Sequence, residues 1–277
     1  SLDGMTWELM DDFLPSLMVA ESPGQSAVLH VGGGLLTGQS GVIGFEVDTV
    51  GQMTVAGAET NVSFLQSLSV GFGGVGHLTV SDGAQLLARD LSIGELTSGD
   101  GTLNITGDGS LVDVPFFMLL NHGRVAVNDG ATLRVSLLGT AVFQNATLTG
   151  NGTVESELFN FGIVDPGMTA GRGGTLTIVG NYDQVADIPG LGSTAGTLRI
   201  DAGLDGYDQL SVTGTASLSG GLRVVAGDTW DPASGTEFAF LQAADVDGRF
   251  DVAFMPGLGD DRFAKLVYPG EARGDGS

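Results

Sequence analysis

A glycine-led unit recurs four times along this chain, and its spacing restricts the possible fold more than any other feature. The units are GQMTVAGAETNV, GHLTVSDGAQLL, GTLNITGDGSLV and GRVAVNDGATLR, which begin at Gly51, Gly76, Gly101 and Gly123 and are therefore spaced 25, 25 and 22 residues apart. Strands this short cannot bury their apolar faces alone, but they can when each repeat stacks on the next. The period therefore predicts a solenoid. A β-propeller blade needs about 40 residues, so the repeat is too short for that fold.

The alternation inside each unit predicts which side chains face the interior. Two apolar positions in every unit alternate with polar neighbours, which is typical of a half-buried strand. These inward positions are Met53 and Val55, Leu78 and Val80, Leu103 and Ile105, and Val125 and Val127. Interleaved motifs such as SLSVGFGG and DLSIGELT add a further strand to each coil. Because parallel crossovers are almost always right-handed, we predict an all-β protein, a right-handed parallel β-helix (solenoid) with terminal caps.

Composition divides the chain into four segments. Residues 1–26 are expected to be an N-terminal cap or a degenerate first coil, and the helical spacing of apolar residues in MTWELMDDFLPSLM favours a short amphipathic helical cap. Residues 27–195 are predicted to form the repeat β-helix. Residues 196–268, where aromatic side chains concentrate, are predicted to form C-terminal β coils or a capping segment, and residues 269–277 a linker or tail.

Two stretches of the repeats, DLSIGELTSGDGTLNITGDGSL and SLSVGFGGVGHLTVSDGAQL, are similar to repeats of bacterial autotransporter passengers and of PEP-CTERM-associated surface proteins. The segment NATLTGNGTVESELFNFGIVDPGMTAGRGGTLTIVGNYDQ from Asn145, and the later GTLRIDAGLDGYDQLSVTGTASLSGGLRV, resemble recurrent passenger segments. The resemblance extends from about Ala27 to Tyr268. It implies a secreted or surface-displayed β-helix of a Gram-negative-type bacterium, and its motifs imply no particular activity.

The charge of the chain disfavours two kinds of partner. Ten basic residues against 33 acidic ones give a net charge of −23, which repels phosphate backbones and anionic lipid headgroups, so we expect no nucleic-acid partner. No apolar run is long enough for a membrane span, and Ser1 begins without a basic signal-peptide region, so we expect a mature or excised piece. The absence of cysteine excludes thiol catalysis and cysteine metal sites.

Calcium is the one cofactor that the sequence raises, and only weakly. The stretch GFGGVGHLTV resembles the start of a calcium-binding nonapeptide array, but Leu78 occupies the place where that motif needs an aspartate. Asp-Gly pairs at equivalent places in three units make Asp82, Asp108 and Asp129 weak calcium candidates. Aspartate and glycine also supply the backbone conformations of tight turns, and we favour this second interpretation.

No catalytic constellation is apparent, so no catalytic residue is predicted. His30, His77 and His122 lie on separate coils and are expected to face solvent, because a zinc site needs converging ligands. Asp165, and Asp205 with Asp208, are carboxylates in or near turns, and the arginines are isolated in the sequence and form no basic constellation in a shared motif. A threonine column that would suggest ice binding is broken, since Thr54 and Thr79 are followed by Asn104 and Ala126 at the equivalent positions.

The repeat architecture without an active-site constellation predicts an extracellular structural or display β-helix, such as a stalk, matrix or surface-layer-type component, and not an enzyme. A surface adhesin that binds a cell-surface glycan or protein is the alternative. Association with other copies of the same chain is a further possible interaction. A carbohydrate-active β-helix enzyme is less favoured. An exposed aromatic row would favour the adhesin, and a groove with carboxylates and an arginine would favour the enzyme. The scarcity of aromatic residues between Ala27 and Gly196 favours the structural role.

Overall fold

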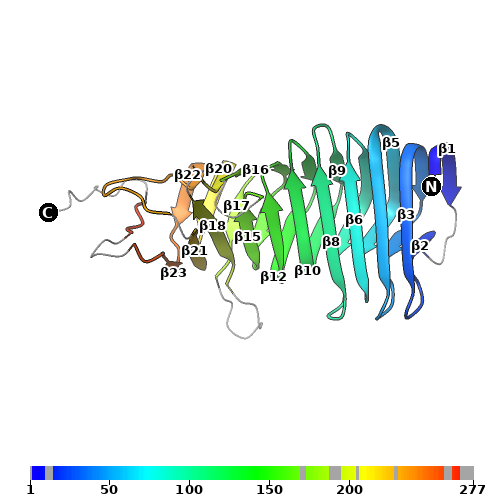
Figure 1. The fold of residues 1–277 in the computed structure, drawn as a ribbon, viewed down its shortest axis with the longest axis horizontal. Coiled ribbons are helices and arrows are strands. Elements are labelled where there is room, and N and C mark those ends of the chain that lie inside the picture. The colour runs from blue at the N-terminus through cyan, green and yellow to red at the C-terminus, as the bar shows by residue number, and fades with distance from the viewer. Residues whose placement is uncertain are drawn as a thin grey trace.

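The computed structural model describes residues 2–9 (backbone alone), 15–168, 173–186, 195–203, 206–227, 230–258 and 264–268. Within these residues the protein is all-β, with parallel strands stacked as a β-solenoid of about eight turns. Figure 1 shows an elongated rod in which the coils follow one another along the long axis from the N-terminal to the C-terminal end. The fold class predicted from the repeat period is confirmed. None of the described residues forms a helix that is long and apolar enough to cross a membrane.

Three columns of paired strands form the sides of the rod, and long strands bend from one side to the next. Side A contains β3 (Ser26–Gly38), β5 (Val50–Val70), β6 (Val75–Ser81), β8 (Asp100–Thr106), β10 (Phe117–Asn128), β12 (Thr140–Gly150), β15 (Ile163–Pro166), β18 (Thr197–Gly203), β21 (Gly221–Ala226) and β23 (Val252–Phe254). Side B contains β1 (Leu2–Leu9), β3, β5, β7 (Gln85–Ile93), β9 (Leu111–Val114), β11 (Thr132–Val135), β13 (Thr153–Glu155), β16 (Thr175–Val179), β20 (Gln209–Leu218) and β22 (Leu241–Gly248).

Side C completes each coil. It contains β2 (Leu17–Val19), β4 (Gly41–Ile43), the later part of β5 and of β7, the first parts of β10 and β12, β14 (Leu158–Asn160), β17 (Tyr182–Gln184), and parts of β20 and β22. These pairings are all parallel. The short strand β19 (Gly206–Tyr207) differs, because it pairs antiparallel with β18 and forms a hairpin on side A.

The interior is a set of aliphatic ladders that run along the rod. On side A, Met53, Leu78, Leu103 and Val125 are opposite one another on successive strands, and each is at most 1% exposed. Val55, Val80, Ile105 and Val127 form the neighbouring ladder and are fully buried. The inward positions predicted from the alternation are therefore confirmed. Burying these side chains supplies most of the free energy that holds adjacent coils together.

The favoured helical cap at the N-terminus is wrong. Strand β1 pairs in parallel with β3, with Trp7 opposite Leu36, and β2 pairs with β4, so this segment extends the stack as a first coil. An isolated helix of this length is marginal in water, whereas the exposed edge of β3 offers a row of unpaired backbone groups. Met10, Phe13 and Leu14, which also contributed to the helical pattern, lie outside the described residues.

A buried polar network replaces the aliphatic ladder at one place on side C. The Asn160 amide donates to the Tyr182 hydroxyl at 3.0 Å, and this hydroxyl donates to Gln184 Oε1 at 2.6 Å. The Gln184 amide nitrogen in turn donates to the carbonyls of Gly196, Ser219 and Gly221. Burial raises the pKa of the Tyr182 hydroxyl, so it stays a neutral donor. The network satisfies carbonyls where coils of unequal length meet.

The C-terminal strands continue the same sides of the rod as far as Phe254 on β23. The segment 269–277, for which the sequence predicts a linker or tail, lies outside the described residues.

Candidate functional site

The outward row of side A changes character toward the C-terminal half of the rod. Thr54, Thr79, Asn104 and Ala126 are opposite one another on successive strands, as the sequence predicts, and the row then continues with Thr149 and Asp165. Small and neutral side chains thus give way to a carboxylate. Asp165 lies at the end of β15, one residue before Pro166 and close to the β18 strand that carries further charged side chains.

Arg199 and Asp201 project from β18 beside Asp165, because residues two apart on a strand point to the same side. The Arg199 guanidinium places Nη1 3.2 Å from Asp165 Oδ2 and Nη2 3.2 Å from Asp201 Oδ2. One arginine thus bridges carboxylates of adjacent coils, a contact that the isolated position of Arg199 in the sequence did not indicate. On the other side of Asp165, Arg124 Nη2 lies 3.4 Å from Thr149 Oγ1.

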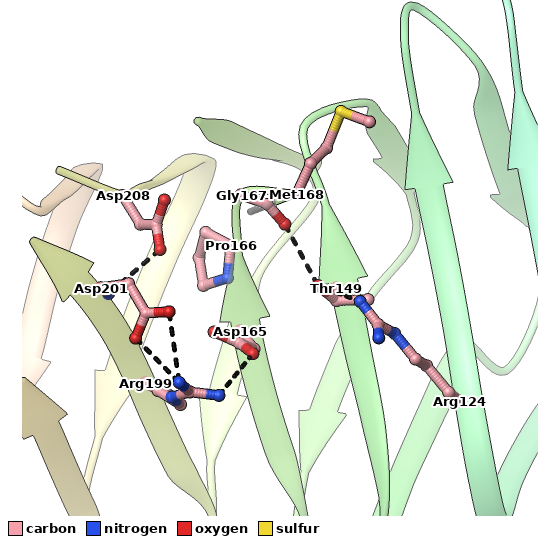
Figure 2. A pocket seen from close by; sticks show the side chains of 9 residues that line it. All are labelled: Arg124, Thr149, Asp165, Pro166, Gly167, Met168, Arg199, Asp201 and Asp208. Carbon is pink, nitrogen blue, oxygen red and sulfur yellow. Dashed lines mark hydrogen bonds and ion pairs between the residues drawn. The ribbon is translucent and has the colours of Figure 1, made fainter. Parts of the chain in front are cut away.

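The β18–β19 hairpin carries a third carboxylate, that of Asp208, back over this group. The chain reverses so that Ala202 pairs with Tyr207, and the Asp208 N–H donates to the Asp201 carbonyl at 2.9 Å. In the reverse direction, the Asp201 N–H donates to Asp208 Oδ2 at 3.0 Å. These reciprocal hydrogen bonds fix the Asp208 side chain beside Asp201, on the side that faces Pro166 and Gly167 (Figure 2).

The three carboxylates converge in a partly closed pocket that we call the carboxylate pocket. It is lined by Arg124, Thr149, Asp165, Pro166, Gly167, Met168, Arg199, Asp201 and Asp208 and has a volume of about 190 Å³. One carboxylate oxygen from each of the three aspartates lies within 4.8 Å of the other two. In the described part of the chain, no other three histidine, aspartate or glutamate side chains converge in this way.

Two of these carboxylates are almost completely buried. Asp208 is 2% exposed and Asp201 6%, and the outer oxygen Oδ1 of each accepts no hydrogen bond. Asp201 Oδ1 still lies 3.1 Å from Nη2 of Arg199, whereas Asp208 has no cation of its own among the described contacts. A buried carboxylate oxygen that accepts no hydrogen bond is costly in free energy, and a proton or a cation at Oδ1 would remove that cost.

Burial dominates the electrostatics of the pocket. It raises the pKa of the Asp208 carboxyl to about 7; the Asp201 and Asp165 carboxylates add to the rise, and the backbone N–H groups of Asp201 and Gly174 oppose it. Burial also raises the pKa of Asp165, with the Arg199 guanidinium acting in the opposite direction. Near neutral pH, Asp208 is therefore protonated in part of the molecules and ionised in the rest.

A contrasting charged group on side B shows how unusual this pocket is. Arg134 lies 2.6 Å from Glu155 and 3.9 Å from Asp113, and these three side chains are between 30% and 41% exposed. Solvent screens such a group, and exposed ion pairs contribute little stability. The carboxylate pocket has the same kind of outward position but is covered by the hairpin.

Gly167 is needed for this covering to form. Its φ is +90°, and a Cβ at this position would lie 2.1 Å from Asp208 Oδ1. We expect Gly167→Ala to lower the free energy of unfolding by about 2–4 kcal/mol, because the backbone is strained and Asp208 must move. Urea denaturation measures this loss. Gly24→Ala is the matched control, because Gly24 has a φ of +78° and open space around it. Equal losses in the two variants would show that the contact with Asp208 is unimportant.

The calcium candidates of the Asp-Gly turns are not brought together. Asp82 and Asp129 have positive φ, and the turns close with hydrogen bonds from Ala84, Ser110 and Ala131 to the residues three positions earlier. These features fit the turn interpretation. Asp82, Asp108 and Asp129 do not belong to the converging carboxylates described above, and calcium binding there stays a prediction.

The other residues considered from the sequence are distributed as follows. His30 is exposed and His77 and His122 are half-buried on separate coils, where the His122 ring nitrogen Nδ1 lies 3.2 Å from the Gly94 carbonyl. Asp205 lies outside the described residues. Asp165 and Asp208 were noted as turn carboxylates, whereas Asp201 and Arg199 were missed. The only signal for these two was an Arg-x-Asp at outward positions of a strand.

Because the comparison with known proteins gives no match for this chain, its function must be inferred from the fold and the carboxylate pocket. No protein-family model, no curated protein and no solved structure matches the chain. The class that these observations define is a parallel β-helix repeat protein with a buried cluster of carboxylates on its outer surface.

Proposed function

We propose that this chain is an extracellular structural or display β-helix, a stalk, matrix or surface-layer-type component without catalytic activity, on the surface of a Gram-negative-type bacterium or secreted from it. The observation that carries the proposal is the aliphatic interior, a single cluster of buried side chains that extends from Val19 on β2 to Leu222 on β21, in coils that are stacked along the long axis of the rod. A filled interior of this kind gives an extended, stiff spacer. The surface location rests on the resemblance of its repeats to autotransporter passengers and PEP-CTERM-associated proteins.

A surface adhesin is the second candidate, and exposed aromatic side chains support it. Phe143 and Phe161 stack with ring centroids 5.6 Å apart, and Phe45 and Phe72 stack at 5.3 Å. Phe143 is 36% exposed and could contact a sugar ring or an apolar protein surface. These two stacks are isolated pairs, and the group of Tyr207, Phe238 and Trp230 is packed edge-to-face and tilted. None of these aromatic groups in the described residues extends as a row, which favours the structural role over the adhesin.

The carboxylate pocket does not suit carbohydrate cleavage. Glycosidases place a sugar between two carboxyl groups that are about 5–9.5 Å apart, in a groove open to the substrate. Here the three carboxylates lie closer together, two of them are almost fully buried, and the pocket of about 190 Å³ is smaller than the roughly 300–1,000 Å³ typical of small-molecule sites. These features support a pocket that serves the structure.

A spacer should tolerate a change in length by whole coils. Val75 is opposite Asp100 and Gly76 opposite Gly101, so deleting residues 76–100 removes one coil and joins Val75 to Gly101 in register. We expect this variant to fold, to keep a cooperative thermal transition, and to be shorter by about 4.8 Å, the distance between neighbouring strands. Circular dichroism and small-angle X-ray scattering measure these outcomes. Deleting only residues 76–88 is the control, because it removes β6 and leaves an incomplete coil that we expect to misfold.

The role itself is tested on intact cells that display the protein with a terminal tag. Antibody access to the tag should decrease when residues 76–100 are deleted and increase stepwise when one, two and four further copies of this coil are inserted. Tag access that is independent of length would contradict the spacer. Saturable binding to a glycan or protein panel that is lost in Phe143→Ala would replace it with the adhesin, and release of sugar products from polysaccharides would replace it with an enzyme.

A further inference from the structure

The charges of the carboxylate pocket do not balance. Asp165, Asp201 and Asp208 contribute three negative charges, and Arg199 is the only cation that contacts a carboxylate of the three in the described structure. Arg124 contacts Thr149 instead. With all three aspartates ionised, the carboxylates and Arg199 sum to −2, and Arg124, which lines the pocket without contacting a carboxylate, reduces the excess to −1. A bound cation would offset this excess of negative charge. From this imbalance and the geometry below, we propose that the carboxylate pocket is a calcium site, in which Asp165, Asp201 and Asp208 each supply a ligand oxygen.

The buried oxygens without donors are an independent indication of a ligand. The N–H of Asp201 holds the Asp208 side chain in place through Oδ2. Asp208 is only 2% exposed, and its other carboxylate oxygen, Oδ1, accepts no hydrogen bond. Oδ1 of Asp201 is in the same situation apart from its contact with Arg199. Native proteins rarely leave buried acceptors unpaired, and such exceptions often mark an ion. A bound cation would satisfy both.

The distances between the carboxylates suit calcium better than magnesium. Calcium binds oxygen at about 2.3–2.6 Å, so two of its ligands can be up to about 5 Å apart, and it accepts several carboxylates in irregular geometry. The three aspartate oxygens within 4.8 Å of one another are inside that limit. Magnesium bonds of about 2.0–2.1 Å limit the separation to about 4.2 Å, and magnesium keeps much of its water. A crowded, partly closed pocket therefore favours calcium.

The ion would connect the β18–β19 hairpin region with β15, which lies more than 30 residues earlier in the sequence. Asp165 is the penultimate residue of β15, Asp201 belongs to β18, and Asp208 immediately precedes β20, which is on the adjacent side of the rod. A single cation would thus fasten the β18–β19 hairpin onto the coil before it. This site adds to the proposed structural role, and its existence does not depend on that role.

Calcium titration of the intact protein tests the site. After removal of metals with a chelator, CaCl₂ is titrated calorimetrically at pH 7.5 in 0.15 M NaCl, and thermal unfolding is recorded with and without calcium. We expect one ion per chain, an increase of several degrees in Tm, and at least tenfold weaker binding of Mg²⁺. Asp208→Asn keeps the size of the side chain and its hydrogen bond from Asp201, and it should weaken calcium binding at least tenfold. If circular dichroism shows this variant unfolded, Asp165→Asn, at a more exposed position, takes its place.

The matched control removes three carboxylates from the turns. The triple variant Asp82→Asn, Asp108→Asn and Asp129→Asn should bind calcium within about twofold of the parent. Binding that is lost in the triple variant and retained in Asp208→Asn would move the site to the turns and overturn the proposal. Magnesium binding as tight as calcium binding would overturn the choice of ion. A calcium effect on Tm that equals that of NaCl at the same ionic strength would show that only screening occurs, and that too would overturn it.

Discussion

Leu103→Asp is expected to lower the free energy of unfolding by on the order of 4 kcal/mol or more, because it places a carboxylate inside a dry ladder. Leu103 is fully buried between Leu78 and Val125 of the adjacent coils, and no described basic side chain faces it there. The damage should not stay local, since each coil is stable only through its neighbours. Urea denaturation followed by circular dichroism measures the loss.

Thr102→Asp is the matched control for this variant. Thr102 precedes Leu103 on β8, is half-buried on the outer surface, and lies opposite His77 and Arg124. The same new charge is solvated here and close to an arginine, so the expected change is less than about 1 kcal/mol. If Leu103→Asp and Thr102→Asp unfolded at the same urea concentration, the assignment of inward and outward positions on side A would be incorrect.

A second large effect is expected from pH. In the absence of divalent ions, the Asp208 carboxyl has a pKa of about 7 in the folded protein, against roughly 3.9 in an unfolded chain. Between these values the folded state holds a proton that the unfolded state releases. Its contribution is therefore fully present below about pH 4 and is lost as pH rises through 7, by on the order of 2–4 kcal/mol. Urea denaturation in a chelator at intervals from pH 4 to 8 measures the slope.

Asp208→Asn isolates this contribution from the other carboxylates. Among the described residues, the charged groups that face Asp208 are Asp165, Asp201, Arg199 and, further away, Arg124, and all four are kept in the variant. The difference in stability between the variant and the parent should therefore increase in favour of the variant as pH rises toward 8. Parallel pH profiles for the two proteins would exclude a proton on Asp208 as the cause.

The interior of the rod could be predicted from the sequence because it repeats. Residues such as Leu78 and Leu103 occupy equivalent positions in successive units, and alternation along one short strand is enough to distinguish the inside from the outside. For residues 1–26 the sequence leaves a first coil as the alternative to the favoured cap, and there is a physical reason why it does not favour the coil. The apolar residues around Trp7 fit a helical period, but the free edge of β3 offers a full row of hydrogen bonds, and this tertiary contact prevails over local spacing.

Only some residues of the carboxylate pocket could be identified from the sequence, and their convergence could not be predicted. Asp165 and Asp208 were recognised as turn carboxylates, but their meeting depends on a coil with a hairpin that brings residues 43 positions apart into contact, from 165 to 208. Outward side chains follow no repeat, so Arg199 and Asp201 carried no periodic signal. The burial of Asp208 depends on Gly167, and nothing in a single sequence indicates which glycine a remote side chain will cover.

The parallel pairing of the strands has a mechanical consequence. Hydrogen bonds between coils run along the rod, so a force that pulls its two ends apart acts along these bonds and opens one coil at a time. The coil from Gly76 to Asp100 has 25 residues, which extend to roughly 85 Å when released, against about 4.8 Å in the stack. Each coil that opens therefore lengthens the protein by far more than the height that this coil occupied in the rod. A pull at one end is relaxed by the coils nearest to it, while the remaining coils keep their shape.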